Sequence, residues 1–319
     1  MIERLPITSY DKWLRWRRQD VTASAVGALF GCHPYQTALR LYCEKCGLEF
    51  PELDNRVMRR GRLMEPGAAL AVEEERPEWK LIKADSYYRD PDKRIGATPD
   101  FLIAGDPRGP GVLQTKSIDP RVFERDWLDG ERVPFWIVLQ TLTEAMLTES
   151  TFGVVGGLVD DFDKTICIKE FSRHPASEAR IIEAVRRFWD DVAAGREPDP
   201  DYGRDANLLP LIAPRERQSK ALDLTGNNEV PSLLAERAYL CASIARSEAR
   251  CKEIETELKF LMRDAECVTG LPGWNITFKT GTRAGYSVPA KEMRILRILD
   301  RRPKEEREQG DEHDRDARA

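Results

Sequence analysis

Residues 96–116 restrict the fold of this chain more than any other segment. Two runs of strand character flank residues 105–111, which are dense in the glycine and proline that reverse a chain. The pattern predicts a β-hairpin. A hairpin at this place brings an acid, Asp100, beside an amide and a lysine of the second strand, Gln114 and Lys116.

The alternation of a β-strand determines how these side chains point. Residues two apart share a face, so Gln114 and Lys116 are expected to point together while Leu113 and Thr115 turn toward the core. A carboxylate suits a divalent cation, and a lysine steadies a water or a phosphate. The segment therefore predicts a cluster typical of metal-dependent nucleases.

The composition is that of an ordinary globular chain. Hydrophobic residues make up 41% and charged residues 33% of 319 residues, and the formal net charge is −5. This balance excludes a chain that is basic throughout, but a local basic channel is enough for phosphate contact. The sequence contains no run of about 18 apolar residues, so it predicts no membrane span. The first residues lack a signal peptide's apolar core. The seven scattered cysteines do not form a secreted disulfide scaffold, so we expect a cytoplasmic, reduced protein.

The chain is expected to divide into four zones. Residues 1–200 alternate helical and strand patterns and carry the motifs, which predicts a nuclease-like domain. Residues 201–230, poor in periodicity, are predicted to be a linker. Residues 231–290 are predicted to form a helical appendage with a small hairpin, and the charged residues 303–319 a disordered tail.

The appendage shows a heptad-type pattern. Its apolar side chains recur at spacings of three and four, with Ser247 in the gap, at Leu240, Ile244, Cys251, Ile254, Leu258 and Leu261. This pattern predicts one long coiled-coil helix. The alternating run 274–279, with Gly281 as a turn and Tyr286 beyond it, predicts the hairpin.

Within the first zone, helices and strands alternate. Helices are predicted from Thr22 toward Phe30, with Thr22 or Ser24 as N-cap, and at 61–70, 135–148 and 178–194. Further strands are predicted at 80–88, 152–158 and 165–171. A strand-rich centre with flanking helices predicts an α/β or α+β fold with a mixed sheet.

Four motifs occur in one order along the chain. They are Trp13 and Arg17 ahead of Val21-Thr22-Ala23-Ser24 and then Gly31, Pro34 and Tyr35; Gly61 to Pro66; Thr98-Pro99-Asp100 with Lys116; and Pro134 with Gln140. Together they resemble the YqaJ-type viral recombinase family, relatives of the lambda-type exonuclease in the PD-(D/E)XK nuclease superfamily. The likeness covers about residues 10–195. It has one departure, because Gln114 stands where the family carries an acid.

The resemblance implies a restriction-endonuclease-like core and a function. Members of the family are Mg²⁺-dependent exonucleases, with Mn²⁺ as a substitute, that digest one strand of linear double-stranded DNA from its 5′ end. They act in phage-type homologous recombination beside a single-strand annealing protein, in the cytoplasm of a bacterial host. Lambda-type members form closed rings, so a homo-oligomer is left open.

The resemblance also assigns metal ligands. Asp100 and Glu65 are the expected carboxylates, and Lys116 is expected to orient the attacking water. Gln114 offers an amide oxygen to a hard cation, but it brings no charge and cannot act as a base.

Two further groups complete the predicted site. Gln140 matches the family's helix glutamine, and Glu144 lies one turn further, so we hypothesise that Glu144 supplies the missing carboxylate. Arg17 stands where the family carries an arginine for the 5′ phosphate, and Thr22 and Ser24 are expected to complete that anion site.

Alternatives stay open at this point. Without the acid at position 114, the chain would be a catalytically impaired scaffold that binds DNA ends, and the same fold also serves endonucleases. Cys32 with His33, and the pair Cys43 and Cys46, are ligand types for zinc or an iron–sulfur cluster, whereas residues 39–46 predict an ordinary helix.

Overall fold

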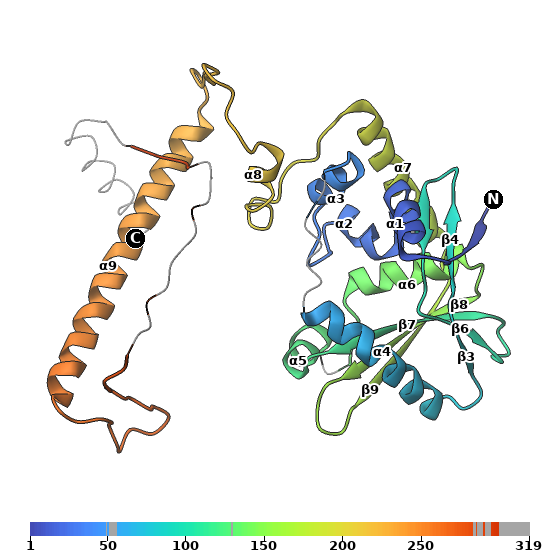
Figure 1. The fold of residues 1–319 in the computed structure, drawn as a ribbon, viewed down its shortest axis with the longest axis horizontal. Helices are drawn as coiled ribbons and strands as arrows, with labels where there is room; N and C mark the ends of the chain where they lie inside the picture. The colour runs from blue at the N-terminus through green and yellow to red at the C-terminus, as the bar shows by residue number, and fades with distance from the viewer. Residues whose placement is uncertain are drawn as a thin grey trace. The chain divides into compact units, whose positions relative to one another are not determined.

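The computed structural model describes residues 1–48, 50, 56–128 and 130–282, together with 285, 290 and 295–299 (Figure 1). It divides into two compact units, Met1–Ala213 and Pro214–Ala319. The tail predicted at 303–319 lies outside the described residues. Among the helices that are described, none is long and apolar enough to span a bilayer.

The first unit is built around a five-stranded sheet in the order β3-β6-β7-β8-β9. The strands are β3 Lys80–Lys83, β6 Phe101–Ala104, β7 Gly111–Ile118, β8 Phe152–Val159 and β9 Ile166–Ser172. The predicted hairpin is confirmed: β6 and β7 pair antiparallel, with Phe101 opposite Leu113. Strands β7 and β8 run parallel, so the chain crosses between them through α5 (Pro120–Trp127) and α6 (Phe135–Leu147).

Helices cover both faces of this sheet. Neighbouring residues of a strand point to opposite faces, and two glycines of β8 identify what lies on each. A Cβ at Gly156 would lie 2.9 Å from Val72 of α4 (Arg56–Glu75), whereas a Cβ at Gly153 would lie 2.6 Å from Thr141 of α6. Both helices therefore approach closely because glycine leaves room. The mixed α/β class predicted from the sequence is confirmed.

A four-stranded sheet in the order β1-β4-β5-β2 adjoins the core of the first unit. Its strands are β1 Glu3–Pro6, β4 Ser86–Asp90, β5 Ile95–Ala97 and β2 Val21–Thr22. The remaining helices of this unit are α1 Tyr10–Gln19, α2 Val26–Leu29, α3 Ala38–Lys45, α7 Pro175–Ala194 and α8 Leu209–Ile212. Side chains of α2, α3, α6 and α7 share one large apolar cluster with this sheet. Helix α6 is thus buried almost all round, which makes its polar residues informative.

The single strand predicted at 80–88 is wrong. Ala84 and Asp85 separate β3 from β4, and the two strands belong to different sheets. Strand β3 pairs with β6, whereas β4 pairs with β1 and β5. At the break, the Ala84 amide donates to the carbonyl of Asp100 at 3.1 Å, so the chain turns beside the hairpin.

The helix predicted from Thr22 toward Phe30 is wrong at its start. Thr22 ends β2, whose extended backbone is held by parallel pairing with β5. A 3₁₀ turn, Ala23–Ala25, follows before α2 begins. Ser24 therefore lies inside the turn, and Thr22 precedes it without a side-chain cap hydrogen bond.

The first unit extends beyond residue 200, into the segment expected to be a linker. The buried hydroxyl of Thr37 donates to the buried carboxylate of Asp205 at 2.7 Å. Leu208 packs in an apolar cluster with Leu39 and Cys43. Residues 201–213 are thereby fixed to the core of this unit.

The second unit contains the long helix α9, Glu229–Met262. In the run predicted to form the first strand of a hairpin around Gly281, Thr277 pairs with Cys267, in the segment before it. The amide of Phe278 likewise donates to the carbonyl of Glu266 at 2.9 Å. Tyr286, the far side of the predicted hairpin, lies outside the described residues.

Candidate active site

A pocket of about 260 Å³ in the first unit collects most of the predicted site residues. Those that line it are Arg17, Thr22, Ser24, Glu65, Asp100, Gln114, Gln140 and Glu144. They come from α1, the start of the 3₁₀ turn, α4, the β6–β7 hairpin and α6. Segments far apart in the sequence therefore meet here, as the motif order led us to expect.

Asp100 is held by the strand beside it. Its Oδ2 accepts hydrogen bonds from Gln114 Nε2 at 2.6 Å, from the Thr115 amide at 2.8 Å and from the Thr115 hydroxyl at 2.7 Å. The antiparallel register explains this, because it pairs Phe101 with Leu113 and sets Asp100 beside Gln114. Thr115 is buried, as predicted, and its amide and hydroxyl also hold the acid in place. Within the described residues, Asp100 Oδ1 receives no hydrogen bond.

Gln140 joins the other predicted residues into one network. Its Nε2 donates to Gln114 Oε1 at 2.8 Å and to Glu144 Oε1 at 2.9 Å. Its Oε1 accepts from Lys116 Nζ at 3.1 Å. Gln114 and Lys116 thus point toward the same helix residue, as the strand alternation predicts.

Glu144 is a buried acid with an unsatisfied oxygen. Its side chain is 1% exposed, and Oε2 is buried without a hydrogen-bond partner among the described residues. Burial raises the pKa of Glu144 to about 8, and the negative charge of Asp100 adds to this rise; Gln140 and Lys116 oppose it. A buried acceptor without a partner is costly, so this carboxyl either keeps a proton or awaits a cation.

Lys116 has a lowered pKa. Burial is the main cause, and the charges of Asp100 and Glu144 act in the opposite direction. The ammonium also lies 5.3 Å from the centroid of the Trp136 ring. The lysine therefore connects the polar network to an aromatic side chain that the sequence did not single out.

Glu65 lines the pocket but is engaged elsewhere. Its carboxylate forms an ion pair with Lys83 of β3. Burial lowers the pKa of Lys83, although the charge of Asp100 counteracts this shift. The sequence did not point to Lys83, because its place beside the pocket depends on the break between β3 and β4.

The donor set fits a hard cation. All the acceptors are oxygens, and those that accept no hydrogen bond from the described residues include Asp100 Oδ1 and Glu144 Oε2. Mg²⁺ accepts one or two protein carboxylates together with waters and phosphate oxygens. In the described part of the chain, no three His, Cys, Asp or Glu side chains converge as metal ligands. A cation here would therefore take further oxygens from Gln114, from Glu65 released by Lys83, or from substrate and water.

The pocket is also lined by groups suited to an anion. The Arg17 guanidinium lies 4.4 Å from the centroid of the Trp13 ring, and burial lowers its pKa. No carboxylate of the described residues forms an ion pair with it. The hydroxyls of Thr22 and Ser24, which also line the pocket, lie 3.1 Å apart, and Trp13 Nε1 donates to Thr98 Oγ1 at 3.0 Å.

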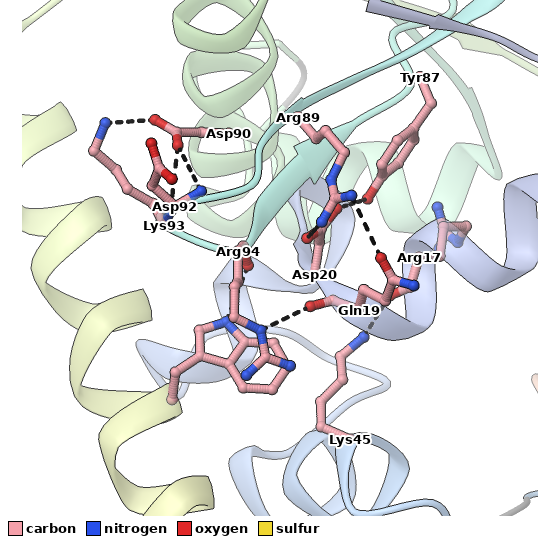
Figure 2. Close-up of polar contacts among 11 residues, drawn as sticks. Arg17, Gln19, Asp20, Lys45, Tyr87, Arg89, Asp90, Asp92, Lys93 and Arg94 are labelled. Atoms are coloured by element: carbon pink, nitrogen blue, oxygen red, sulfur yellow. Dashed lines mark hydrogen bonds and ion pairs between the residues drawn. The ribbon is translucent and has the colours of Figure 1, made fainter. Parts of the chain in front are cut away.

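Figure 2 shows how the C-terminal end of α1 is anchored behind Arg17. Lys45 Nζ donates to the carbonyl of Arg17 at 2.7 Å. The fully buried Asp20 accepts from Arg89 Nη2 at 2.8 Å and from the Tyr87 hydroxyl at 3.1 Å. Because these partners come from α3 and β4, the last turn of α1 is fixed in position and Arg17 with it.

Comparison with known proteins identifies the part of the chain that carries this pocket. Residues 12–151 match the family model of the YqaJ-like viral recombinase domain. The uncharacterized protein R354 of Acanthamoeba polyphaga mimivirus is 25% identical over 150 residues, which are 43% of this chain and 26% of that protein. The chain thus spans about a quarter of the length of this relative.

Solved structures show weaker likeness. An alkaline exonuclease (LHK-Exo) from Laribacter hongkongensis is 20% identical with a TM-score of 0.47, covering 62% of this chain and 99% of that one. A phage related exonuclease from Haemophilus somnus 129PT is 13% identical with a TM-score of 0.44, covering 55% and 96%. The family match itself includes every residue of the predicted site. The candidate site therefore lies within the part of the chain that matches the YqaJ-like viral recombinase domain.

Proposed function

We propose that this chain is a metal-dependent nuclease that digests linear double-stranded DNA from its 5′ end in phage-type homologous recombination. The observation that carries the proposal is the network in which Gln140 joins Gln114, Lys116 and Glu144 beside Asp100. An acid, a lysine and a buried second acid joined in one network are the groups that phosphodiester hydrolysis needs. The annealing protein implied by the resemblance is part of the proposal as its partner.

Asp100 and Glu144 are the carboxylates that would hold the metal. Mg²⁺, when bound, would make water a better nucleophile at neutral pH and offset charge on the phosphate. Lys116 supplies a positive charge and donor hydrogens to the attacking water or a phosphate oxygen. Gln140 is a positioning residue, because it contacts Lys116 and Glu144 and fixes both.

Polarity would come from the groups of the pocket that suit an anion. Arg17 has a guanidinium without an ion-pair partner in the described structure, and the hydroxyls of Thr22 and Ser24 line the same pocket. A 5′ phosphate held there would place the adjoining phosphodiester toward Asp100. Guanidinium groups suit phosphate because they donate several hydrogen bonds in one plane.

A second function has a specific observation behind it. Gln114 carries no charge, and Glu65 is paired with Lys83 rather than directed at Asp100. If Glu144 does not supply the charge, the chain would bind DNA ends without cutting them.

The deciding experiment compares linear with covalently closed circular double-stranded DNA, in Mg²⁺ and in EDTA, for the wild type and Lys116→Ala. We expect loss of the linear DNA alone, dependent on Mg²⁺ and on Lys116. Binding of linear DNA without cleavage would favour the end-binding scaffold instead. Cutting of the closed circle would identify an endonuclease.

A further inference from the structure

An aromatic group next to Lys116 has no part in the function proposed above. On one side Lys116 Nζ donates to Gln140 at 3.1 Å, toward the pocket. On the other it lies 5.3 Å from the ring centroid of Trp136, in the first turn of α6. Trp136 is therefore adjacent to the proposed catalytic lysine.

Two more rings continue from Trp136 toward the surface. His33 lies 5.0 Å from it between ring centroids, and Tyr35 lies 6.5 Å from it at an interplanar angle of 79°. His33 and Tyr35 are 6.1 Å apart at 77°. The group ends in solvent, since Tyr35 is 80% exposed.

The exposed ring stands on a rigid base. The Tyr35 amide donates to His33 Nδ1 at 3.1 Å, and Arg204 Nη1 donates to the His33 carbonyl at 2.6 Å. Burial, with the charges of Lys116 and Arg204, lowers the pKa of His33 to about 4, so its ring is neutral at pH 7 and can accept. A Cβ at Gly27 would lie 2.8 Å from Trp136 Cβ, so Trp136 packs tightly against the backbone at Gly27.

We propose that Tyr35, supported by Trp136, is a stacking platform for an unpaired nucleobase at the DNA end, next to the bond that is cut. Every base offers a π-face, so stacking holds a strand without reading its sequence. Lys116, beside the rings, provides positive charge for the strand's phosphates, whereas Arg204 is ion-paired with Asp201 at 2.7 Å. A base inside the duplex is already stacked on its neighbours, so the platform takes a base released by fraying. This inference rests on the proposed action at DNA ends.

The test uses a linear duplex whose unpaired 5′-terminal base is 2-aminopurine, kept uncut in EDTA. Stacking on Tyr35 quenches this fluorophore, so binding of the wild type lowers its emission. Tyr35→Ala is expected to abolish the quench and weaken binding of the frayed end roughly five- to hundred-fold, the range for loss of one base–aromatic stack. Tyr35→Phe keeps the ring and should behave as the wild type. Phe162→Ala, which removes a ring 98% exposed between β8 and β9, is the matched control and should change neither signal.

The outcomes separate this inference from the proposed function. The platform would be overturned if Tyr35→Ala still quenches the fluorophore, or if the wild type does not quench it. Either result would count even if Mg²⁺-dependent cleavage of linear DNA is intact. Quenching that requires Tyr35 in a protein that cuts no DNA would support the platform and reject the nuclease. Equal thermal unfolding of Tyr35→Ala and wild type excludes a folding defect.

Discussion

Glu144 and Gln114 are linked through a single side chain: Gln140 Nε2 donates to Gln114 Oε1 at 2.8 Å and to Glu144 Oε1 at 2.9 Å. The position where the family carries an acid therefore holds a neutral amide, and a buried acid lies within two hydrogen bonds of it. Glu144 projects from α6, one turn after Gln140, whereas Gln114 lies on β7. The carboxyl group expected on the strand is thus present on the helix instead.

We predict that Glu144→Gln lowers Mg²⁺-dependent cleavage of linear DNA by roughly 10²- to 10³-fold, the range for loss of one electrostatic group at a reacting centre. The change keeps the size of the side chain and its bond with Gln140, so only the charge is lost. The measurement is the single-turnover rate at saturating protein. Glu124→Gln, at an exposed position of α5, is the control and should cut normally. Full activity of Glu144→Gln would exclude Glu144 as the replacement for the missing acid.

Moving the acid back to the strand tests the same relationship from the other side. We predict that Gln114→Glu, added to Glu144→Gln, restores most of the lost rate, because the site then regains one carboxylate beside Asp100. Gln114→Glu alone would crowd a third acid against Asp100 and Glu144 and should help less. The double-mutant cycle of cleavage rates measures this coupling. Additive effects of the two changes would mean that the residues act independently.

The pH dependence of stability provides a test that needs no DNA. In the metal-free protein the pKa of Glu144 is about 8, against an ordinary value of 4.5. Between these values the folded state holds a proton that the unfolded state has released, so the free energy of unfolding falls as pH rises. Below pH 4.5 the contribution is complete, and above pH 8 it is lost. We predict that urea midpoints in EDTA fall from pH 6 to pH 9 more steeply in wild type than in Glu144→Gln.

The sequence predicted the parts of the site that depend on local geometry. The β6–β7 hairpin follows from turn residues and strand alternation, and it placed Asp100 beside Gln114 correctly. The i+4 spacing on α6 likewise placed Glu144 beside Gln140. These relationships involve neighbouring elements or a single helix, so periodicity is sufficient to find them.

Contacts that depend on the tertiary fold were missed. Lys83 pairs with Glu65 because the chain leaves β3 at Ala84 to join a second sheet, and a continuous strand pattern at 80–88 conceals that break. Tyr35 meets Trp136 only after α6 packs against the segment around Gly27. No spacing in the sequence relates residues a hundred positions apart.

Arg17 should give the protein a preference for phosphorylated ends. We predict that Arg17→Ala cuts DNA with a 5′ phosphate about 10- to 100-fold more slowly, because hydrogen bonds to a charged group are lost, and that it no longer distinguishes 5′ phosphate from 5′ hydroxyl. Arg15→Ala, on an exposed position of the same helix, should retain the preference. The measurement is the ratio of the initial cleavage rate on DNA with a 5′ phosphate to that on DNA with a 5′ hydroxyl. If Arg17→Ala keeps the wild-type ratio, the phosphate is recognised elsewhere.

Helix α9 is expected to pair with α9 of a second copy, parallel and in register. Several side chains of its heptad seam are exposed in the described structure: Leu240 by 49%, Ile244 by 57% and Ile254 by 42%. In that heptad Cys251 occupies an a position, where a parallel dimer brings each residue against its own counterpart.

Charge at the flanks of this seam favours the same arrangement. Arg250 and Glu255 fall at g and e, so each would meet its opposite on the partner helix. An antiparallel pair would instead set Glu248 near Glu255, and these two acids would repel each other. We therefore predict that mild oxidation yields a disulfide-linked dimer, that Cys251→Ser abolishes it, and that Cys241→Ser does not. Non-reducing electrophoresis with light scattering measures both the bond and the mass; a protein that stays monomeric would exclude the coiled coil.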